Sequence, residues 1–335
     1  MIGKLVNLIN TEFTVMKSFI IKLLLLLAII PAVAQENIPG KRAHHSLIYD
    51  DALGKVILTG GSTPLNGGSS FVFYDDVWSF DGKAWKKEAV TGDQRSGVGL
   101  AYDSKNGKIM SMGGFSPMNT TLGDLRELSG TRWKPVKDVS DMAAAEGTFV
   151  YDSDRDKFVF FGGSKSRGML RNTTWEWDRT DWKKIETAGP EARQAHAMVY
   201  DSKRKKIVLF GGTGGTPNDK YGDTWEFDGT IWMKVSNEGP GFRMSMGYAY
   251  DSKSGLFIIF GGAGANGIMS DTWAWDGKEW KQLATSGPTP RMMGYMAYDR
   301  KRDRVVLFGG RLGWPNDAND TWEFDGVSWK EVMLK

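Results

Sequence analysis

Short apolar runs alternate with polar turns along most of the chain, and they recur in a fixed order that predicts four strands per unit. The first strand ends in Tyr-Asp, as in residues 47–50, and the second is a β-branched run such as residues 206–210. Runs this short suit strands that are buried on both faces. The third strand alternates large and polar side chains, as in residues 223–228, which is typical of a half-buried strand. The fourth begins at a tryptophan after an Asp-Gly hairpin turn.

A Gly-Gly pair ends the second strand of every unit. Its six copies are separated by 53, 49, 49, 50 and 48 residues and begin at Gly60, Gly113, Gly162, Gly211, Gly261 and Gly309. Strands of this kind with a period of about 50 residues predict a β-propeller. One blade cannot bury both of its faces, whereas a ring of stacked blades can. The sequence therefore predicts an all-β fold, a six-bladed β-propeller of four-stranded blades.

The units resemble the kelch repeat in four features: an arginine ahead of the first strand, Tyr-Asp, Gly-Gly and the spaced tryptophans. The resemblance, to the class that includes the central domain of galactose oxidase, covers the chain from Arg42 to Trp329. It implies one propeller over residues 35–335. The expected blades are approximately residues 41–90, 91–139, 140–188, 189–238, 239–286 and 287–335.

Two blades depart from the repeat. Blade two has Leu-Arg-Glu-Leu at residues 125–128 in place of the tryptophan-centred third strand, and blade three has Ala144 in place of the arginine. Each departure is either a functional asymmetry or simple drift, which repeat arrays tolerate. No blade lacks a strand, so we expect the ring to close by packing of blade one on blade six, with residues 35–39 as a candidate edge strand.

The strand order places two kinds of connection on opposite faces of the ring. The turns from first to second strand and from third to fourth strand are minimal, and they share what we call the short-turn face. The second-to-third loops and the inter-blade links are longer and share the long-loop face. The longest of these loops are residues 62–75, 213–222 and 311–319. Long loops on a rigid scaffold are where function usually lies.

Five arginines lie seven residues before the repeat tyrosine: Arg42, Arg95, Arg193, Arg243 and Arg291. In one interpretation they ring the channel mouth and bind an acidic ligand, because guanidinium pairs well with carboxylate. The resemblance agrees, since arginines in this part of some kelch domains contact acidic peptides. In the other interpretation they clamp adjacent blades. A binding site is usually asymmetric whereas a fold determinant repeats, so the repetition favours the clamp.

Trp314 is the one tryptophan of 14 that has no place in the repeat. It precedes Pro315 in the blade-six loop, where it is a candidate stacking platform for a sugar or a peptide. The alternative is that it covers the base of its own loop. Tyr74 and Tyr221 lie in equivalent loops and are secondary binding candidates.

Glu146 is the candidate acid/base residue. It lies at the entrance of the inner strand of blade three, two residues after Ala144, with Arg95 or Arg193 of the adjacent blades as candidate partners. A carboxylate near the channel is what a sugar-modifying enzyme of the mutarotase or epimerase type needs, as in exported kelch mutarotases. The sequence thus leaves two main hypotheses, a binding module and a sugar-modifying enzyme.

Other chemistry has less support. The chain has no cysteine, which removes disulfides, thiol nucleophiles and the Cys-linked tyrosine of the kelch copper oxidases. His45 and His196 share one repeat position, with His44 the only other histidine, and suit strand-edge hydrogen bonds. Methionines near the last inner strands suit core filling or, as a third hypothesis, Cu(I): Met244, Met246, Met292, Met293 and Met296. We predict no metal site and no cofactor.

The first 34 residues resemble a secretory signal. Lys17 and Lys22 precede an apolar core, and Ala32-Val33-Ala34 ends it, so we expect cleavage before Gln35. An uncleaved anchor helix is the alternative, and Met16 is a candidate natural start. The mature chain keeps a net charge of about +1 and has no basic run, which argues against nucleic-acid binding. We expect an exported monomer, periplasmic or extracellular, that is free of the membrane after signal removal and binds a protein or glycan ligand.

Overall fold

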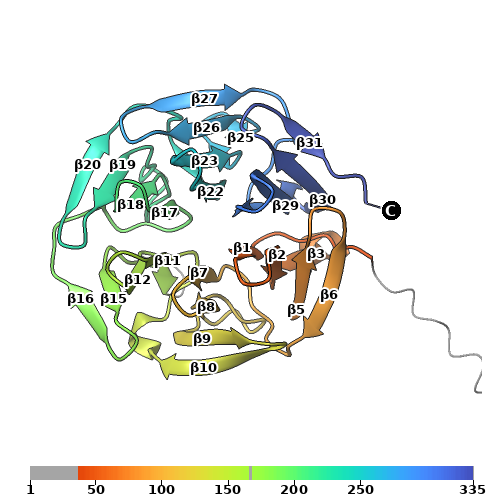
Figure 1. The fold of residues 1–335 in the computed structure, drawn as a ribbon, viewed down its shortest axis with the longest axis horizontal. Helices are drawn as coiled ribbons and strands as arrows, with labels where there is room; N and C mark the ends of the chain where they lie inside the picture. Colours follow the sequence, from red (N-terminus) through yellow and green to blue (C-terminus); the bar gives the residue numbers. More distant parts are fainter. Residues whose placement is uncertain (1–36, 166–167, 335) are drawn as a thin grey trace, which may run out of the picture. The chain divides into compact units, whose positions relative to one another are not determined.

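Six four-stranded antiparallel sheets, each built from one continuous stretch of chain, form a ring (Figure 1), and residues of all six inner strands line a central channel. This computed structural model describes residues 37–165 and 168–334, so the predicted signal segment, residues 1–34, lies outside the described residues. The all-β, six-bladed propeller expected from the repeat is confirmed. No helix in the described part is long and apolar enough to cross a membrane.

In the first three blades the strands follow chain order across the sheet. Blade one contains β1 (Ser46–Asp50), β2 (Lys55–Thr59), β5 (Asp76–Phe80) and β6 (Trp85–Val90). Blade two contains β7 (Gly99–Asp103), β8 (Lys108–Met112), β9 (Asp124–Ser129) and β10 (Arg132–Asp138). Blade three contains β11 (Thr148–Asp152), β12 (Lys157–Phe161), β15 (Thr174–Trp177) and β16 (Trp182–Ile185).

The last three blades follow the same order. Blade four contains β17 (Ala197–Asp201), β18 (Lys206–Phe210), β19 (Thr224–Phe227) and β20 (Trp232–Ser236). Blade five contains β22 (Gly247–Asp251), β23 (Leu256–Phe260), β26 (Thr272–Trp275) and β27 (Trp280–Ala284). Blade six contains β28 (Tyr295–Asp299), β29 (Arg304–Gly313), β30 (Asn316–Phe324) and β31 (Trp329–Glu331).

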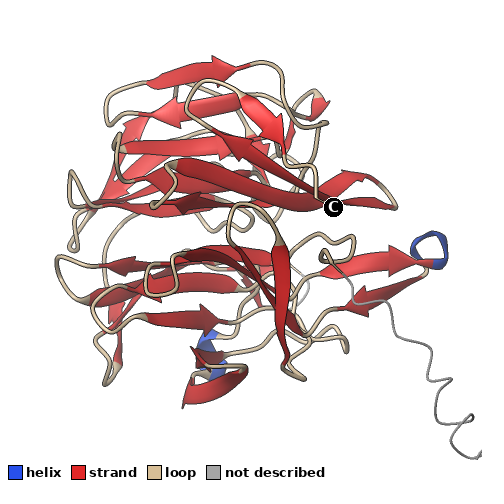
Figure 2. Cartoon of the chain, turned by 45° about the vertical axis from the view of Figure 1, so that its right-hand side comes forward, coloured by secondary structure: helices blue, strands red, loops and turns tan. Residues whose placement is uncertain are grey.

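Two of the long connections are hairpins rather than irregular loops. β3 (Ser62–Leu65) and β4 (Ser70–Phe73) pair with each other, and the 3-10 turn η1 (Asn66–Gly68) lies at the tip of the projecting hairpin (Figure 2). In blade six, β29 and β30 continue past the sheet until Gly313 pairs with Asn316. The remaining short elements are η2 (Ser140–Met142), β13 (Ser164–Lys165), β14 (Met169–Leu170), β21 (Arg243–Met244), β24 (Ala263–Gly264) and β25 (Gly267–Ile268).

The Gly-Gly pairs form the joints between blades. The second glycine donates its N–H to the carbonyl at the arginine position of the next blade, as Gly61 does to Arg95 at 2.8 Å. A Cβ on the first glycine, Gly60, would lie 2.6 Å from that same carbonyl oxygen. Both glycines also have positive φ, of 65° and 93°. A side chain would therefore strain the backbone and push the blades apart, which explains why the pair recurs.

Blade six packs on blade one in the same way as the other blades pack on their neighbours. Gly310 donates its N–H to the Arg42 carbonyl at 2.9 Å, and Trp85 donates its Nε1–H to Thr321 Oγ1 at 2.9 Å. One apolar cluster contains Trp78 of blade one and Phe308 of blade six. Equivalent Trp-to-Thr bonds join three further pairs of blades: Trp232 to Thr174, Trp280 to Thr224 and Trp329 to Thr272. The described residues 37–39 form no strand.

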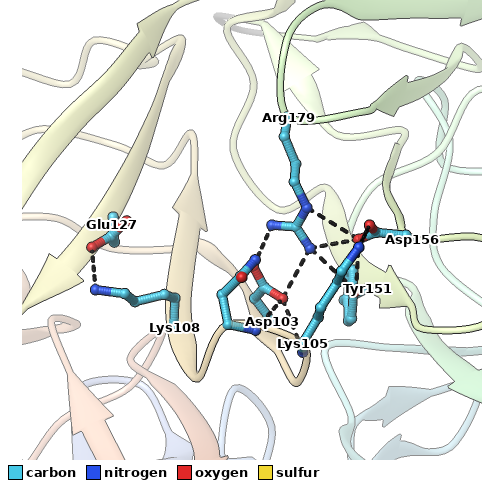
Figure 3. Close-up of polar contacts among 8 residues, drawn as sticks. Asp103, Lys105, Lys108, Glu127, Tyr151, Asp156 and Arg179 are labelled. Carbon is cyan, nitrogen blue, oxygen red and sulfur yellow. Dashed lines mark hydrogen bonds and ion pairs between the residues drawn. The ribbon is translucent and has the colours of Figure 1, made fainter.

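On the short-turn face, arginines join neighbouring blades. A Cβ on Gly229, in the Asp-Gly turn of blade four, would lie 2.5 Å from the Arg155 guanidinium of blade three. The same contact recurs between Gly277 and Arg204 and between Gly82 and Arg302, whereas Gly326 of blade six has no atom within 4 Å of such a Cβ. Blade two has Asn106 at the arginine position, and blade three has Arg179 at the glycine position. Arg179 reaches back to bind Asp103 of blade two (Figure 3). The arginine of this joint therefore comes from the opposite blade.

Candidate functional site

The five repeat arginines are buried at the long-loop edge of the blades. Arg42 is fully buried and lies 2.6 Å from Asp76 and 3.1 Å from the carbonyl oxygen of Gly60. The other four pairs are Arg95 with Asp124, Arg193 with Asp223, Arg243 with Asp271 and Arg291 with Asp320. Each guanidinium ties the entry segment of a blade to the second and third strands of that same blade. It is a clamp within one blade rather than between blades, and it leaves no exposed guanidinium for a ligand.

Tyr74 and Tyr221 pack on two of these clamps. The guanidinium carbon of Arg42 lies 3.8 Å from the centre of the Tyr74 ring, and that of Arg193 lies 4.0 Å from the Tyr221 ring. Contacts of this kind stabilise a buried cation through the electron-rich ring face. The Tyr74 hydroxyl also donates to the Lys41 carbonyl at 3.0 Å. The two rings thus complete the clamps, which is a structural role that the sequence did not indicate.

Blade three has lost both members of the clamp together. The strand register aligns Thr173 with the clamp aspartate of the other blades, and Ala144 stands at the arginine position. The Thr173 hydroxyl still accepts the Nε1–H of Trp175 at 3.2 Å, as Asp76 accepts that of Trp78 at 2.8 Å. No buried ion is left unpaired, so Ala144 is a matched structural change rather than the mark of a site.

The other atypical blade has a similar explanation. Arg126 of blade two stands where blade one has Trp78, and it forms ion pairs with Asp93 and with the clamp residue Asp124. Arg126 thus replaces an aromatic side chain, and both of its acidic partners lie at the same edge of blade two. Neither departure from the repeat therefore marks a ligand site.

Six residues at one repeat position form a closed ring of backbone hydrogen bonds at the long-loop end of the channel, which we call the rim. Each N–H donates to the carbonyl of the equivalent residue in the preceding blade, at 2.7–3.2 Å. The six residues are His44, Gly97, Glu146, Ala195, Ser245 and Met293. All six have positive φ, between 53° and 66°. The backbone alone makes this ring, so the rim side chains are free to differ from blade to blade.

Two titratable rim side chains meet across Gly97, which has no side chain. His44 Nε2 lies 3.5 Å from Glu146 Oε1 and has no hydrogen-bond partner. Burial raises the pKa of Glu146 to about 7. Burial, and secondarily the charge of Arg311, lower the pKa of His44 to about 4. The imidazole is therefore neutral at neutral pH and cannot act as a counter-ion for the carboxylate.

Neither arginine expected beside Glu146 lies there, because Arg95 and Arg193 are held by their own aspartates. Within residues 37–165 and 168–334, His44 is the only ion-pair partner of Glu146. The expectation of an arginine partner for Glu146 is therefore wrong. The physical reason is that the arginine position of the repeat is used for the clamp in each adjacent blade.

A small cavity of about 20 Å³ lies beside Glu146 and His44. It is bordered by Thr148, Ser245, Tyr248 and Tyr295 among others, and it has room for about one water molecule. A larger cavity of about 330 Å³ occupies the channel between the six inner strands, and Tyr248 and Tyr295 border both cavities. The small polar cavity, which we call the channel neck, lies at the long-loop end of the wider channel and is bordered by Glu146, His44, Tyr248 and Tyr295.

The histidines beside this neck differ in role. His196 forms a 2.6 Å hydrogen bond with Thr148 Oγ1, as expected for a strand-edge residue. The His45 ring packs edge-on against Tyr295 and Phe308 and lies beside the backbone of Phe308. Burial lowers the pKa of His45, and the Phe308 backbone acts to raise it by less.

A second candidate region lies where the two hairpins of blades one and six adjoin. We call it the hairpin patch: Leu65, Phe71, Leu312 and Trp314, which are 44%, 44%, 38% and 56% exposed. The Phe71 and Trp314 rings are 5.8 Å apart, and a Cβ on Gly68 would lie 2.3 Å from the Trp314 ring. Trp314 therefore packs on the neighbouring hairpin and still presents more than half of its surface.

Arg311 links the hairpin patch to the rim. Its guanidinium carbon lies 5.0 Å from the centre of the Trp314 ring, and its charge contributes to the lowered pKa of His44. Arg311 is itself paired with Asp317 at 2.9 Å. The largely buried Arg311 thus lies between the hairpin patch and the channel neck.

Sequence reasoning missed His44, Leu65, Phe71 and Leu312. Aligning the six repeats places His44 in the column of Glu146, and that signal was available. The other three depend on which hairpins adjoin in space, which no single repeat contains. Met246 and Met296 are buried in two separate apolar clusters, and no group of three or more His, Cys, Asp or Glu suited to a metal occurs in the described part.

Comparison with protein-family models gives a match to a repeat domain. The model of the KLHDC2/KLHL20/DRC7 Kelch-repeats domain matches residues 148–334, which is more than half of the chain. A search of curated proteins found no significant match.

Proposed function

Since the chain belongs to the kelch-repeat family, whose repeats generally mediate protein–protein interaction, we propose that it holds a protein partner on its long-loop face. The observation that carries this proposal is the hairpin patch, in which exposed apolar side chains lie on two adjoining hairpins and the Phe71 and Trp314 rings pack together. Clustered aromatic and aliphatic anchors of this kind are typical of protein interfaces. The partner is expected to present an apolar segment that covers Phe71 and Trp314.

The short-turn face offers a natural contrast. Its exposed apolar side chains include Leu53 and Val327, which are 62% and 77% exposed, and each stands alone at the tip of a turn. Single exposed apolar residues are normal on a soluble protein. The two faces can therefore be compared within one protein.

Site-specific photo-cross-linking tests the proposal. A photoreactive residue replaces Leu312 in one variant and Leu53 in the other, and cross-linked products are identified from cells that express the protein. We expect one recurring protein partner from position 312 and none from position 53. Cross-linking to the partner should fall at least tenfold when Trp314→Ala is added, while Val327→Ala should leave it unchanged. Equal products from both positions would reject the proposal, and capture of a glycan or a second copy of this chain would replace the protein partner.

A sugar-modifying enzyme is the second candidate function, and one observation favours it: Glu146 has a raised pKa beside His44 at the channel neck. Two observations oppose it. The cavity of about 20 Å³ is too small for a sugar ring, and no arginine lies within ion-pair distance of Glu146 in the described part. Anomer interconversion of common monosaccharides, followed by NMR with wild type and Glu146→Gln, tests this function. Equal rates for the two proteins would reject it.

We also propose export, on the basis of the sequence of residues 1–34. The mass of the mature protein checks this directly. A chain that begins at Gln35 is the expected result, and a chain that retains earlier residues contradicts cleavage there.

A further inference from the structure

Glu146 is a largely buried acid, with a side chain that is 15% exposed, and the described part of the chain provides no cation for it. The other buried acids at this end of the blades are each matched, as Asp76 is by Arg42 and Asp317 by Arg311. Glu146 has only the neutral imidazole of His44, at 3.5 Å. A carboxylate held this way is costly unless a positive charge reaches it.

The surroundings of Glu146 suit a cation. Tyr248 and Tyr295 border the same cavity, and aromatic rings attract cations through their faces. Ser245, Thr148 and the free Nε2 of His44 offer oxygen and nitrogen acceptors for the N–H groups of a ligand. The cavity is thus lined by neutral acceptors around a single acid.

The size of the cavity selects among cations. About 20 Å³ accommodates one group the size of a water molecule, which an ammonium group matches. A guanidinium, with three nitrogens around a carbon, is too large. A divalent metal ion is disfavoured because the described residues place no three acidic or histidine ligands together.

We propose that the channel neck is a binding site for a primary alkylammonium group, which inserts between Glu146, His44 and the two tyrosines. One form of this proposal rests on the proposed function: the ammonium group is that of a lysine of the protein partner. That lysine enters the neck while the rest of the partner covers the hairpin patch. A free small amine carries the same group. Arg311, which lies against the Trp314 ring and near His44, lies between the two contacts.

Binding should depend on pH through Glu146. The titratable groups that face it are His44, His196, Tyr248 and Tyr295, with His45 and Arg311 behind them. The pKa of each histidine is lowered and that of each tyrosine is raised, so none of these groups titrates between pH 5.5 and pH 8. Glu146 ionises in that window, and an alkylammonium stays charged throughout it.

The test uses n-butylammonium chloride as the probe, with n-butanol and n-butylguanidinium as comparison ligands and ligand-observed NMR as the readout. At pH 8 we expect butylammonium to bind at least tenfold more tightly than either. Its affinity should fall at least tenfold at pH 5.5, and Glu146→Gln should remove the preference for butylammonium. Glu238→Gln, which removes an exposed acid from an inter-blade link, should bind as wild type does.

Equal binding of butylammonium and butanol overturns the proposal, as does unchanged butylammonium binding in Glu146→Gln. Glu146→Asp keeps the charge and should retain part of the preference, which separates loss of the carboxylate from loss of fold. If a partner has been cross-linked from position 312, acetylation of its lysines distinguishes the two sources of ammonium. Unchanged partner binding then assigns the neck to a small amine, and failure of the butylammonium test leaves the hairpin-patch result standing.

Discussion

The two faces of the ring use charged side chains in opposite ways. On the short-turn face, Arg155, Arg204 and Arg302 each bind an aspartate and a glutamate of their own blade and lie against the next blade. On the long-loop face the repeated ion pairs are buried as clamps, and the exposed side chains differ from blade to blade. The repeated ion pairs therefore stabilise the ring, while the side chains that differ from blade to blade lie on its long-loop face.

The rim shows why variation is tolerated there. Its six residues are joined through backbone atoms alone, so the fold places little demand on their side chains. The Asp-Gly turns at Gly82, Gly229 and Gly277 on the short-turn face are different, because an arginine guanidinium fills the space that a Cβ would need. An acid without a cationic partner, such as Glu146, is therefore found at the rim, where backbone hydrogen bonds join the blades.

Breaking one clamp should give the largest effect. Arg193→Ala takes the buried counter-ion from Asp223, whose side chain is only 8% exposed, and leaves it the partly exposed Lys234 at 3.4 Å. Loss of one partner of a buried pair typically costs about 3–5 kcal/mol. Urea denaturation measures the free energy of unfolding. The double variant Arg193→Ala/Asp223→Thr copies the Ala144 and Thr173 pair of blade three and should recover much of the loss. A double variant no more stable than the single one would contradict the clamp.

Removing Glu146, the acid that has no cationic partner, should increase the free energy of unfolding rather than decrease it. The pKa of Glu146 is raised to about 7, so the folded state holds a proton that the unfolded state has lost above pH 4.5. Its contribution to stability is full at low pH and is lost as pH rises through 7. Glu146→Gln should therefore stabilise the protein by about 2–4 kcal/mol at pH 8 and by little at pH 4. Denaturation at the two pH values checks this, and equal effects at both would mean that Glu146 is not buried as an acid.

The repeat predicts the scaffold well because each of its features acts locally. The Gly-Gly spacing, the strand order and the separation of the two faces follow from contacts that recur in every blade. The sequence leaves the role of the five arginines open, because a residue repeated in five blades suits both a ring of ligand-binding side chains and a set of structural clamps. Only the register, which places Arg42 against Asp76, separates them.

The candidate sites were less predictable because they combine different blades. Glu146 was identified from the missing arginine at Ala144, yet that absence is explained by Thr173 and has no bearing on the acid. Trp314 is identified by elimination, and its neighbours Phe71 and Gly68 belong to a hairpin about 250 residues away in sequence. Contacts of that separation appear only once the ring is closed.

Moving the arginine of the joint between blades two and three back to the position it has in other joints should change the free energy of unfolding moderately. Arg179→Gly removes the partner of buried Asp103 and also relieves an arginine held at φ 78°. The lost charged hydrogen bonds are partly exposed and partly offset by the relaxed backbone, so we expect a net loss of about 1 kcal/mol. Adding Asn106→Arg restores the arrangement of blades three, four and six and should return the stability to that of wild type. A double variant that is less stable than Arg179→Gly would show that the joint does not accept an arginine from either side.

The smallest effect on folding should come from Trp314→Ala. Trp280, a repeat tryptophan, is 9% exposed and bonded to Thr224, and Trp280→Ala should cost about 3–5 kcal/mol. Trp314 is 56% exposed and packs on one neighbouring hairpin, so its loss should cost under about 1 kcal/mol. Thermal unfolding of the two variants measures the difference. A near-native melting temperature for Trp314→Ala, together with lost cross-linking at position 312, separates the residue from the scaffold, whereas a loss as large as that of Trp280→Ala would make the hairpin patch part of the ring closure.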